Sequence, residues 1–293
     1  MVAKMVTRFA PSPTGYLHLG HAYSARMGFD AARRHGGTFL LRIEDIDQTR
    51  CRPEFVDGIL EDMHFLGLRF PTPVRKQSDH MADYEAAIQK LLALDVLYPC
   101  FCTRAEIAAE LQAAQSAPQD GAQPAPIYPG RCRSLVPEEA AARMSQGHNY
   151  ALRLSTEKTE RRLRDLGRWP LDFFDTHHGT VAVSPSLVGD VVLARKEVRT
   201  SYHLAVVVDD AIQQVTLVTR GEDLFLSTHV HRQLQALLDL PTPRYAHHPL
   251  LRDVDGERLA KRRGSESIRS LRQKGMSADE MWAKIGCEPL PAV

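Results

Sequence analysis

The chain has 293 residues, of which 43% are hydrophobic and 25% charged, and its formal net charge is +1. This composition is typical of a globular protein with one or two domains and a sizeable core. No apolar run approaches the roughly 20 residues that cross a bilayer, and Arg8 and Pro11 come too early for a signal peptide. We therefore expect a cytoplasmic protein with no membrane partner. The near-zero net charge neither requires nor excludes a nucleic acid, which a local basic patch can bind.

The first distinctive stretch, residues 5–29, predicts a strand, a tight Pro- and Gly-rich turn and the start of a helix. A helix N-terminus presents unpaired N–H groups and a positive dipole end, which suit phosphate. Gly15 and Gly20 allow close approach of the backbone to a ligand. His18 and His21 share one face if the turn is helical, and they can stabilise charge on a phosphate. A surface loop with two exposed histidines is the alternative for this pair taken alone.

A second strand is predicted over residues 38–45, where apolar residues alternate and lead to Glu44 and Asp45. Parallel strands joined by a helix form right-handed units, whose ligands lie at the carboxyl ends of the strands. The acids are thus placed to face a ligand. The alternative is an acidic surface loop without a ligand. Residues 54–63 and 84–92 have apolar residues at helical spacing and predict two helices.

Three of the five cysteines cluster in the sequence. Cys100 and Cys102 form a Cys-x-Cys pair, and Cys132 follows at a distance. Three thiolates can serve a tetrahedral zinc ion, which needs a fourth ligand, and Tyr128 is a candidate oxygen donor. Three reduced, buried cysteines without metal are the alternative. The odd total argues against a disulfide scaffold.

The second half of the chain predicts the return of the sheet. Strand pieces of an inserted region are expected at residues 150–154 and 172–175, and a further strand at 189–195. The near-continuous apolar run at residues 201–210 predicts a strand buried on both faces, and residues 214–219 predict the next. The sheet begun near residue 5 would thus be completed after an insertion of roughly a hundred residues.

Arg220 directly follows the last of these strands, which places it over the ligand crevice. A guanidinium there can hold a carboxylate with two hydrogen bonds. A surface ion pair with Glu222 or Asp223 is the alternative. Helices are expected at residues 229–238, 266–271 and 278–285. The charged run from Arg258 to Arg263 lies between the first two and by itself is most often solvated surface.

Several of these segments carry a family resemblance. The string from Arg8 to Gly15, Arg-Phe-Ala-Pro-Ser-Pro-Thr-Gly, and His18-Leu19-Gly20-His21 resemble the first nucleotide-binding signature of class I aminoacyl-tRNA synthetases of the glutamyl/glutaminyl subgroup. Further matches are Leu41 to Arg50 and the pattern Tyr202, Asp209-Asp210 and Arg220 to Asp223. The second ATP signature is degenerate, since Arg258 replaces its first lysine and Ala260 its serine, while Lys261 aligns with its second lysine.

The resemblance implies an α/β fold, namely a Rossmann-like doubly wound parallel sheet with an inserted zinc-bearing α+β subdomain and a mainly helical C-terminal segment. The expected boundaries are residues 1–97 and 189–238 for the two halves of the catalytic domain, 98–188 for the insertion, and 239–293 for the C-terminal segment with the second ATP signature.

The resemblance also implies roles for individual residues. The residues implied in glutamate binding are Arg8, Ala10, Ser12, Glu44, Tyr202 and Arg220, with Glu44 holding the amino group. ATP, with Mg²⁺, is expected at Pro11, Gly15, His18, Gly20, His21 and Lys261, and the catalytic residues among these are His18, His21 and Lys261. One structural zinc ion per chain is expected on Cys100, Cys102, Tyr128 and Cys132.

The zinc pattern and the short tail after residue 271 resemble the truncated relatives of glutamyl-tRNA synthetase that modify queuosine. That resemblance implies ATP-dependent activation of L-glutamate and its transfer to queuosine at the wobble position of tRNA(Asp), by a monomer. Two alternatives stay open: a glutamyl-tRNA synthetase that charges the 3′ end of a tRNA, and a nucleotide-binding paralogue without catalysis.

Overall fold

A parallel strand–helix–strand unit begins the computed structural model, which describes residues 4–103, 105–107, 127–195, 199–251 and 266–290. Strand β1 (Val6–Phe9) pairs in parallel with β2 (Thr38–Ile43), and helix α1 (Leu19–Arg34) joins them. The strand, turn and helix predicted for residues 5–29, and the strand that leads to Glu44, are confirmed.

The catalytic sheet is assembled from two halves that meet along β1 and β9 (Leu217–Gly221). One half has the order β1-β2-β3, and the other has the order β7-β6-β10-β9. The amide of Thr216 donates to the carbonyl of Val6 at 2.9 Å, which joins the halves. The remaining strands of this sheet are β3 (Arg75–Lys76), β6 (Asp172–Asp175), β7 (Gly179–Ala182) and β10 (Arg244–His248). All of its pairings are parallel except β6 with β7, so the expected doubly wound α/β class holds.

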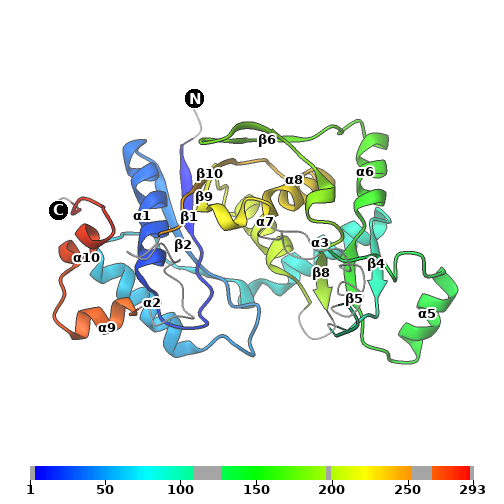
Figure 1. Cartoon of the computed structure of the whole chain (residues 1–293), viewed down its shortest axis with the longest axis horizontal. Coiled ribbons are helices and arrows are strands. Elements are labelled where there is room, and N and C mark those ends of the chain that lie inside the picture. Colours follow the sequence, from blue (N-terminus) through cyan, green and yellow to red (C-terminus); the bar gives the residue numbers. More distant parts are fainter. Residues whose placement is uncertain (1–3, 104, 108–126, 196–198, 252–265, 291–293) are drawn as a thin grey trace, which may run out of the picture.

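Helices pack on this sheet around two apolar cores. Helix α1 lies against β1, β2 and β9, as Figure 1 shows. The other helices of the catalytic part are α2 (Pro53–Phe65), α3 (Met81–Ala93), α7 (Tyr202–Ile212) and α8 (Ser227–Leu238), with short 3₁₀ turns η1 (Gln77–His80) and η3 (Glu222–Leu224). One core gathers residues of α3, α7 and α8, and the other gathers residues of α1, α2 and the C-terminal helices.

The expected strand over residues 201–210 is wrong, because this segment forms helix α7. Ser201 caps the helix, its hydroxyl accepting from the amide of Leu204. Residues 204–210 are all buried, because helices α3 and α8 pack against α7. A helix buried all round shows the same unbroken apolar run as a buried strand, so periodicity cannot separate the two.

The inserted region has its own antiparallel sheet, β4 (Leu97–Cys100), β5 (Ala151–Leu154) and β8 (Val192–Arg195). Because β8 pairs with β5, residues 192–195 belong to this sheet and not to the second half of the catalytic sheet. The prediction that residues 172–175 are a strand piece of the same insertion as residues 150–154 is also wrong, because β6 pairs with β10. The helical elements of this region are α5 (Pro137–Ser145), α6 (Thr156–Asp165) and η2 (Pro185–Leu187).

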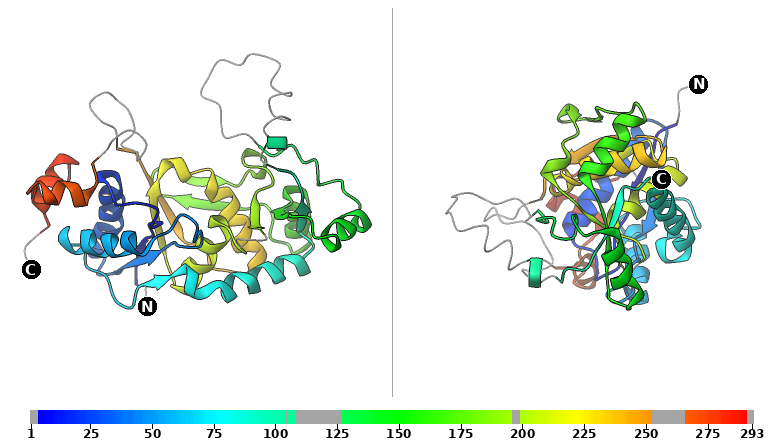
Figure 2. Two further views of the ribbon diagram at one scale, coloured as in Figure 1. Left: turned by 90° about the horizontal axis from the view of Figure 1, so that it is seen from below. Right: turned by 90° about the vertical axis from the view of Figure 1, so that its right-hand side faces the viewer.

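The C-terminal helices α9 (Ile268–Gln273) and α10 (Ala278–Lys284) lie at one end of an elongated molecule, and the inserted sheet lies at the other (Figures 1 and 2). The amide of Ile268 donates to the carbonyl of Leu17 at 2.8 Å, and Arg269 donates to the hydroxyl of Tyr16 at 2.7 Å. These contacts fasten the C-terminal segment to the turn before α1. Within the described residues, no helix is both long enough and apolar enough to span a membrane.

Candidate active site and metal centre

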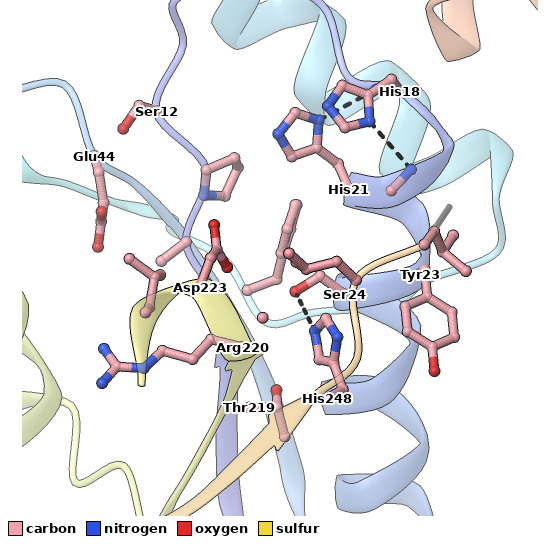
Figure 3. Close-up of a pocket in the computed structure, with 18 of the residues that line it drawn as sticks. Ser12, His18, His21, Tyr23, Ser24, Glu44, Thr219, Arg220, Asp223 and His248 are labelled. Carbon is pink, nitrogen blue, oxygen red and sulfur yellow. Dashed lines mark hydrogen bonds between the residues drawn. The ribbon is translucent and has the colours of Figure 1, made fainter. Parts of the chain in front are cut away.

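A cleft of about 630 Å³ opens at the carboxyl ends of β1, β2 and β9, beside the N-terminus of α1. It gathers predicted site residues that are far apart in the sequence. These are Arg8, Ala10, Pro11, Ser12, His18, Gly20, His21, Glu44, Tyr202 and Arg220. Gly15 does not line the cleft, and Lys261 lies outside the described residues. Figure 3 shows His18 and His21 at one end and Glu44 and Arg220 at the other.

His18 and His21, the two histidines of the first signature, together form the N-terminal cap of helix α1. The amide of Gly20 donates to Nδ1 of His18 at 3.1 Å, and the amide of His18 donates to Nδ1 of His21 at 3.2 Å. Since both Nδ1 atoms accept, a neutral imidazole must carry its hydrogen on Nε2. Both rings therefore present an Nε2–H donor, which is the group that a phosphate oxygen needs. The helix dipole adds to this preference for an anion.

At the other end, Glu44 is a buried acid beside arginine. Its Oε1 accepts from Nη2 of Arg42 at 3.2 Å, and its side chain is 7% exposed. Burial raises the pKa of Glu44, and the charges of Arg42 and Arg8 offset part of that rise. A substrate ammonium at Glu44 would replace the lost solvation of the carboxylate.

Arg8 does not offer an uncompensated charge to a ligand in the cleft. Its Nε donates to Oδ1 of Asp210 at 3.0 Å, and the same oxygen accepts from Arg42 at 2.8 Å. Burial alone would raise the pKa of Asp210, but Arg8 and Arg42 outweigh it and lower this pKa. Asp210 therefore stays ionised and neutralises part of the positive charge near Arg8.

Arg220 differs, because all its recorded side-chain partners are neutral. It donates to His247 Nε2 at 3.1 Å, to Tyr202 Oη and His231 Nδ1 at 3.2 Å each, and to Thr228 Oγ1 at 2.5 Å. Four of its five N–H groups are thus used, and one on Nη2 is left over. A clamp with two hydrogen bonds to a substrate carboxylate would need one of these partners to move. The charge of Arg220, however, meets no carboxylate among the described residues.

Two buried histidines fix the orientation of Arg220. Because a guanidinium always donates, Nε2 of His247 accepts and its Nδ1–H donates to Oδ2 of Asp175 at 2.7 Å. By the same logic Nδ1 of His231 accepts, and its Nε2–H donates to His203 at 3.2 Å. Burial and then the charge of Arg220 lower the pKa values of His247 and His203 to about 4. Burial also lowers the pKa of His231. The two acceptors of Arg220, His231 and His247, therefore stay neutral at physiological pH.

The buried charges near Glu44 and Arg220 are closely balanced. Arg8, Arg42 and Arg220 carry three positive charges, and Glu44, Asp210 and Asp175 carry three negative ones. Asp175 contacts His247 and not Arg220, and the neighbouring Asp209 is matched by Arg75, whose Nε donates to it at 2.8 Å. Among the described residues, no carboxylate contacts Arg220, so a substrate carboxylate can make the first such contact.

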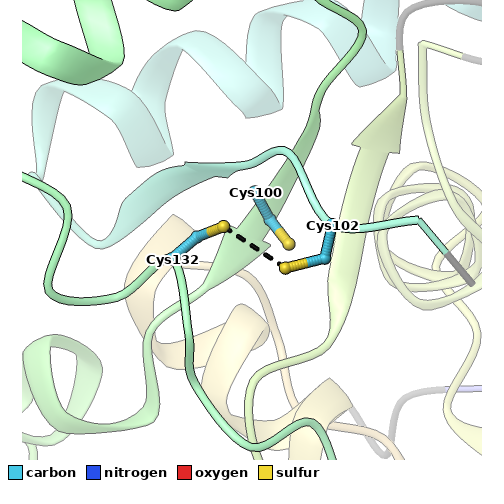
Figure 4. A group of neighbouring side chains, drawn as sticks. All are labelled: Cys100, Cys102 and Cys132. Carbon is cyan, nitrogen blue, oxygen red and sulfur yellow. Dashed lines mark hydrogen bonds between the residues drawn. The ribbon is translucent and has the colours of Figure 1, made fainter. Parts of the chain in front are cut away.

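The predicted metal ligands converge in the inserted region. The Sγ atoms of Cys100, Cys102 and Cys132 lie within 4.8 Å of one another, and Figure 4 shows them pointing together. The hydroxyl of Tyr128 is 3.4 Å from Cys100 Sγ and 3.4 Å from Cys102 Sγ. Tetrahedral zinc with Zn–S bonds of about 2.3 Å separates its ligands by about 3.8 Å. Four donors at these spacings can hold a metal ion.

Without a metal ion, the surroundings of Tyr128 keep its phenol neutral. Burial and the neighbouring thiols raise the pKa of this phenol. The Cζ atom of Arg153 lies 3.8 Å from the ring centroid, and the amide of Cys132 donates to the phenol oxygen at 2.9 Å. A guanidinium over an electron-rich ring is attractive, and both contacts favour phenolate over phenol once a cation is bound.

Sequence reasoning missed the residues that support Arg8 and Arg220. Arg42 and Asp210 belong to matched strings, but nothing local indicated that they neutralise one another. Asp175, His231 and His247 lie on β6, α8 and β10, and only the topology brings them to Arg220. The histidine-rich segments near residues 229–231 and 247–248 were the one available signal.

Histidine donors at the start of a helix, and a cation-lined pocket at the same sheet edge, define a class I tRNA synthetase of the glutamate and glutamine type. The family model for the catalytic domain of tRNA synthetases class I (E and Q) matches residues 4–285, and the chain belongs to this family. More particularly, it belongs with the glutamyl-Q tRNA(Asp) synthetases. It is 45% identical to the protein of that name from Rhodobacter capsulatus, over 96% of this chain and 100% of that one. Identity to the Nocardia farcinica protein is 41%, over 97% and 86%.

Glutamate–tRNA ligases are longer relatives. The ligase of Prochlorococcus marinus (strain MIT 9303) is 39% identical over 95% of this chain, which spans 57% of the ligase. Among solved structures, a glutamate tRNA ligase from Elizabethkingia meningosepticum, in complex with its amino acid, superposes with a TM-score of 0.72 at 28% identity. That match covers 94% of this chain and 54% of the ligase.

Proposed function

We propose that this chain activates L-glutamate with ATP to form glutamyl-adenylate and transfers the glutamyl group to queuosine at the wobble position of tRNA(Asp). Buried Arg220 is the observation that supports glutamate as the amino acid. All of its recorded hydrogen-bond partners are neutral, so its charge can bind a substrate carboxylate. The choice of acceptor is supported by the relatives named glutamyl-Q tRNA(Asp) synthetase.

Glutamate is assigned to the end of the cleft that holds Glu44 and Arg220. Glu44 accepts from the substrate ammonium, and Arg220 with Tyr202 binds the side-chain carboxylate. In Figure 3 the guanidinium of Arg220 points away from His18 and His21, so the carboxylate that reacts with ATP is the other one. Arg8, Ala10 and Ser12 complete this end of the cleft.

In the activation step, the glutamate α-carboxylate oxygen bonds to the α-phosphorus of ATP, and the bond to pyrophosphate breaks. His18 and His21 donate Nε2–H to phosphate oxygens as charge develops. Pro11 and Gly20 line the same cleft, and Gly15 lies in the turn before helix α1. Mg²⁺ bound with ATP would neutralise part of the negative charge of the phosphates. We assign Lys261 to the departing pyrophosphate, because it aligns with the second lysine of the second ATP signature.

The cysteine cluster is assigned to one structural zinc ion, held by Cys100, Cys102, Tyr128 and Cys132. The donor spacings support this assignment, as does the softness of thiolate ligands, which suits zinc. We further propose that the protein works in the cytoplasm as a monomer, where ATP and tRNA are available. A single peak of about 33 kDa by size-exclusion with light scattering would support the monomer.

The experiment uses radiolabelled glutamate, ATP and tRNA(Asp), prepared with and without queuosine. The proposal predicts that label enters only the modified tRNA and is found in the anticodon oligonucleotide after nuclease digestion. The similarity to glutamate–tRNA ligases favours one rival, charging of the 3′ end. Label on the terminal adenosine of tRNA(Glu) would establish that rival. Absence of both transfer and ATP–pyrophosphate exchange would leave only a nucleotide-binding paralogue.

A further inference from the structure

The turn before α1 is paired with the segment that begins α9. Three successive residues on each side lie opposite one another in antiparallel order, namely Tyr16 with Arg269, Leu17 with Ile268 and His18 with Ser267. The first pair is joined by a side-chain hydrogen bond of 2.7 Å and the second by a backbone hydrogen bond of 2.8 Å, and the third forms a β-bridge. The chain that leads into His18 is thus held along its outer edge by the C-terminal segment.

The ring of Tyr16 packs closely against α2. It lies edge-on to the ring of Phe55, with the two centroids 5.0 Å apart. Gly58 is buried on the same helix, and a Cβ atom there would come within 2.9 Å of a ring carbon of Tyr16. Because carbon atoms pack at about 3.5–4.0 Å, the glycine is what allows this approach. The ring is therefore fixed by α2, and its hydroxyl is held where Arg269 reaches it.

Two arginines of α9 make different contacts. Arg269 donates from Nη1 to the hydroxyl of Tyr16, and its Cζ lies 4.8 Å from the centroid of that ring. Arg272 donates from Nη2 to Oε2 of Glu61 on α2 at 2.9 Å. Figure 1 shows α9 beside α2. Arg272 thus fastens α9 to α2, whereas Arg269 contacts the turn that leads to His18.

The backbone of this turn sets the place of both imidazoles. The amide of His18 donates to Nδ1 of His21, and Nδ1 of His18 accepts from the amide of Gly20. A shift of the His18 backbone would therefore displace both rings, and a misplacement of about 1 Å can lower a rate about a hundredfold. Glu44 and Arg220 are placed by β2 and β9 instead, so the amino-acid end of the cleft would not move with the turn.

We infer that Tyr16 and Arg269 are positioning residues for His18 in the activation step. This inference rests on the proposed function, in which His18 and His21 donate to phosphate oxygens. Neither Tyr16 nor Arg269 lines the cleft, so both act through the turn. Their hydrogen bond keeps the two Nε2–H donors in place while charge develops on the phosphates. Its loss should slow the chemistry and leave the binding of glutamate unchanged.

Three variants test this role in ATP–pyrophosphate exchange with glutamate. Arg269→Met keeps the aliphatic stem and removes the donor, and Tyr16→Phe keeps the ring against Gly58 and removes the hydroxyl. Each should lower kcat about tenfold, with the KM for glutamate within about twofold of wild type. The double variant should be no slower than the slower single variant, because both changes remove the same hydrogen bond. Arg269→Lys keeps a donor and should recover most of the kcat.

Arg272→Met is the matched control on the same helix. It should lower the melting temperature by loosening α9 from α2, with kcat within about twofold of wild type. Circular dichroism at the assay temperature checks that each variant is folded.

Wild-type kcat in both Arg269→Met and Tyr16→Phe would overturn the positioning role. So would an equal fall of kcat in Arg272→Met, which would assign the effect to the docking of the C-terminal helices. Losses that add up in the double variant would overturn the pairing of Tyr16 with Arg269. A wild-type protein without exchange would instead contradict the proposed function itself.

Discussion

The carboxylate of Asp175 lies 2.7 Å from Nδ1 of His247, and both side chains are fully buried. The opposite nitrogen of that imidazole accepts from Arg220. Asp175 therefore fixes the tautomer of His247, and the tautomer decides whether Arg220 meets an acceptor or a clashing N–H. Asp175 thus acts on the proposed glutamate pocket through the ring of His247, although it does not line the cleft.

We expect Asp175→Asn to weaken glutamate binding while leaving the chemistry largely intact. An asparagine can present its N–H to Nδ1, which moves the imidazole hydrogen to the side that faces Arg220. The KM for glutamate in ATP–pyrophosphate exchange should rise about tenfold, with kcat within about twofold. Asp172→Asn, on the exposed side of the same strand, is the control and should behave as wild type. An unchanged KM in Asp175→Asn would remove this positioning role.

Acid should destabilise the fold through the histidines near Arg220. The pKa values of His203 and His247 are lowered to about 4 in the fold, against about 6.5 for an unfolded chain. Between these values the unfolded chain binds more protons, so stability is fully present above pH 6.5 and falls as pH drops toward 4. The free energy of unfolding should fall by about 1.4 kcal/mol per pH unit for each histidine.

Urea denaturation at pH 7, 6 and 5 measures this slope. His247→Gln should remove one histidine's share of it, whereas His148→Gln, at an exposed position, should not. A stability that does not change between pH 7 and 5 would mean that these imidazoles are not held neutral.

His18 should contribute to catalysis through Nε2 and to the helix through Nδ1. His18→Asn separates the two, because asparagine is a good N-cap residue but has no equivalent of Nε2–H. We expect kcat of pyrophosphate exchange to fall about a hundredfold, with glutamate affinity and melting temperature little changed. Calorimetric titration with glutamate checks the affinity. Wild-type kcat in this variant would contradict donation to phosphate.

Metal analysis should find about one zinc ion per chain. Cys132→Ser should lose most of it and lower the melting temperature, because a structural site contributes to folding. Tyr128→Phe should keep three thiolates and release zinc more readily to a chelator. Cys287→Ser, outside the cluster, should retain the full zinc content. A fully folded wild-type protein without metal would refute the site.

The first half of the site was accessible from the sequence, because its residues lie in contiguous strings. Glu44 directly follows β2, and His18 to His21 begin the helix that comes after β1 along the chain, so local order predicts position. Arg220 was found for the same reason, at the end of β9.

The supporting residues were not accessible, because they depend on topology. Asp175 reaches His247 only because β6 pairs with β10, whereas the sequence suggested that β6 belonged to the insertion. Helix α7 was mistaken for a strand, since burial on all sides removes helical periodicity. Its Asp210 consequently could not be placed beside Arg8.

The most direct test of the central claim is ATP–pyrophosphate exchange with L-glutamate, L-glutamine and L-aspartate, with and without tRNA. The guanidinium of Arg220, whose recorded partners are all neutral, predicts exchange with glutamate and little with glutamine, because glutamine lacks the second carboxylate. Arg220→Gln should abolish the preference for glutamate over glutamine. Equal exchange with glutamate and glutamine by the wild-type protein, or no exchange under any of these conditions, would contradict the account.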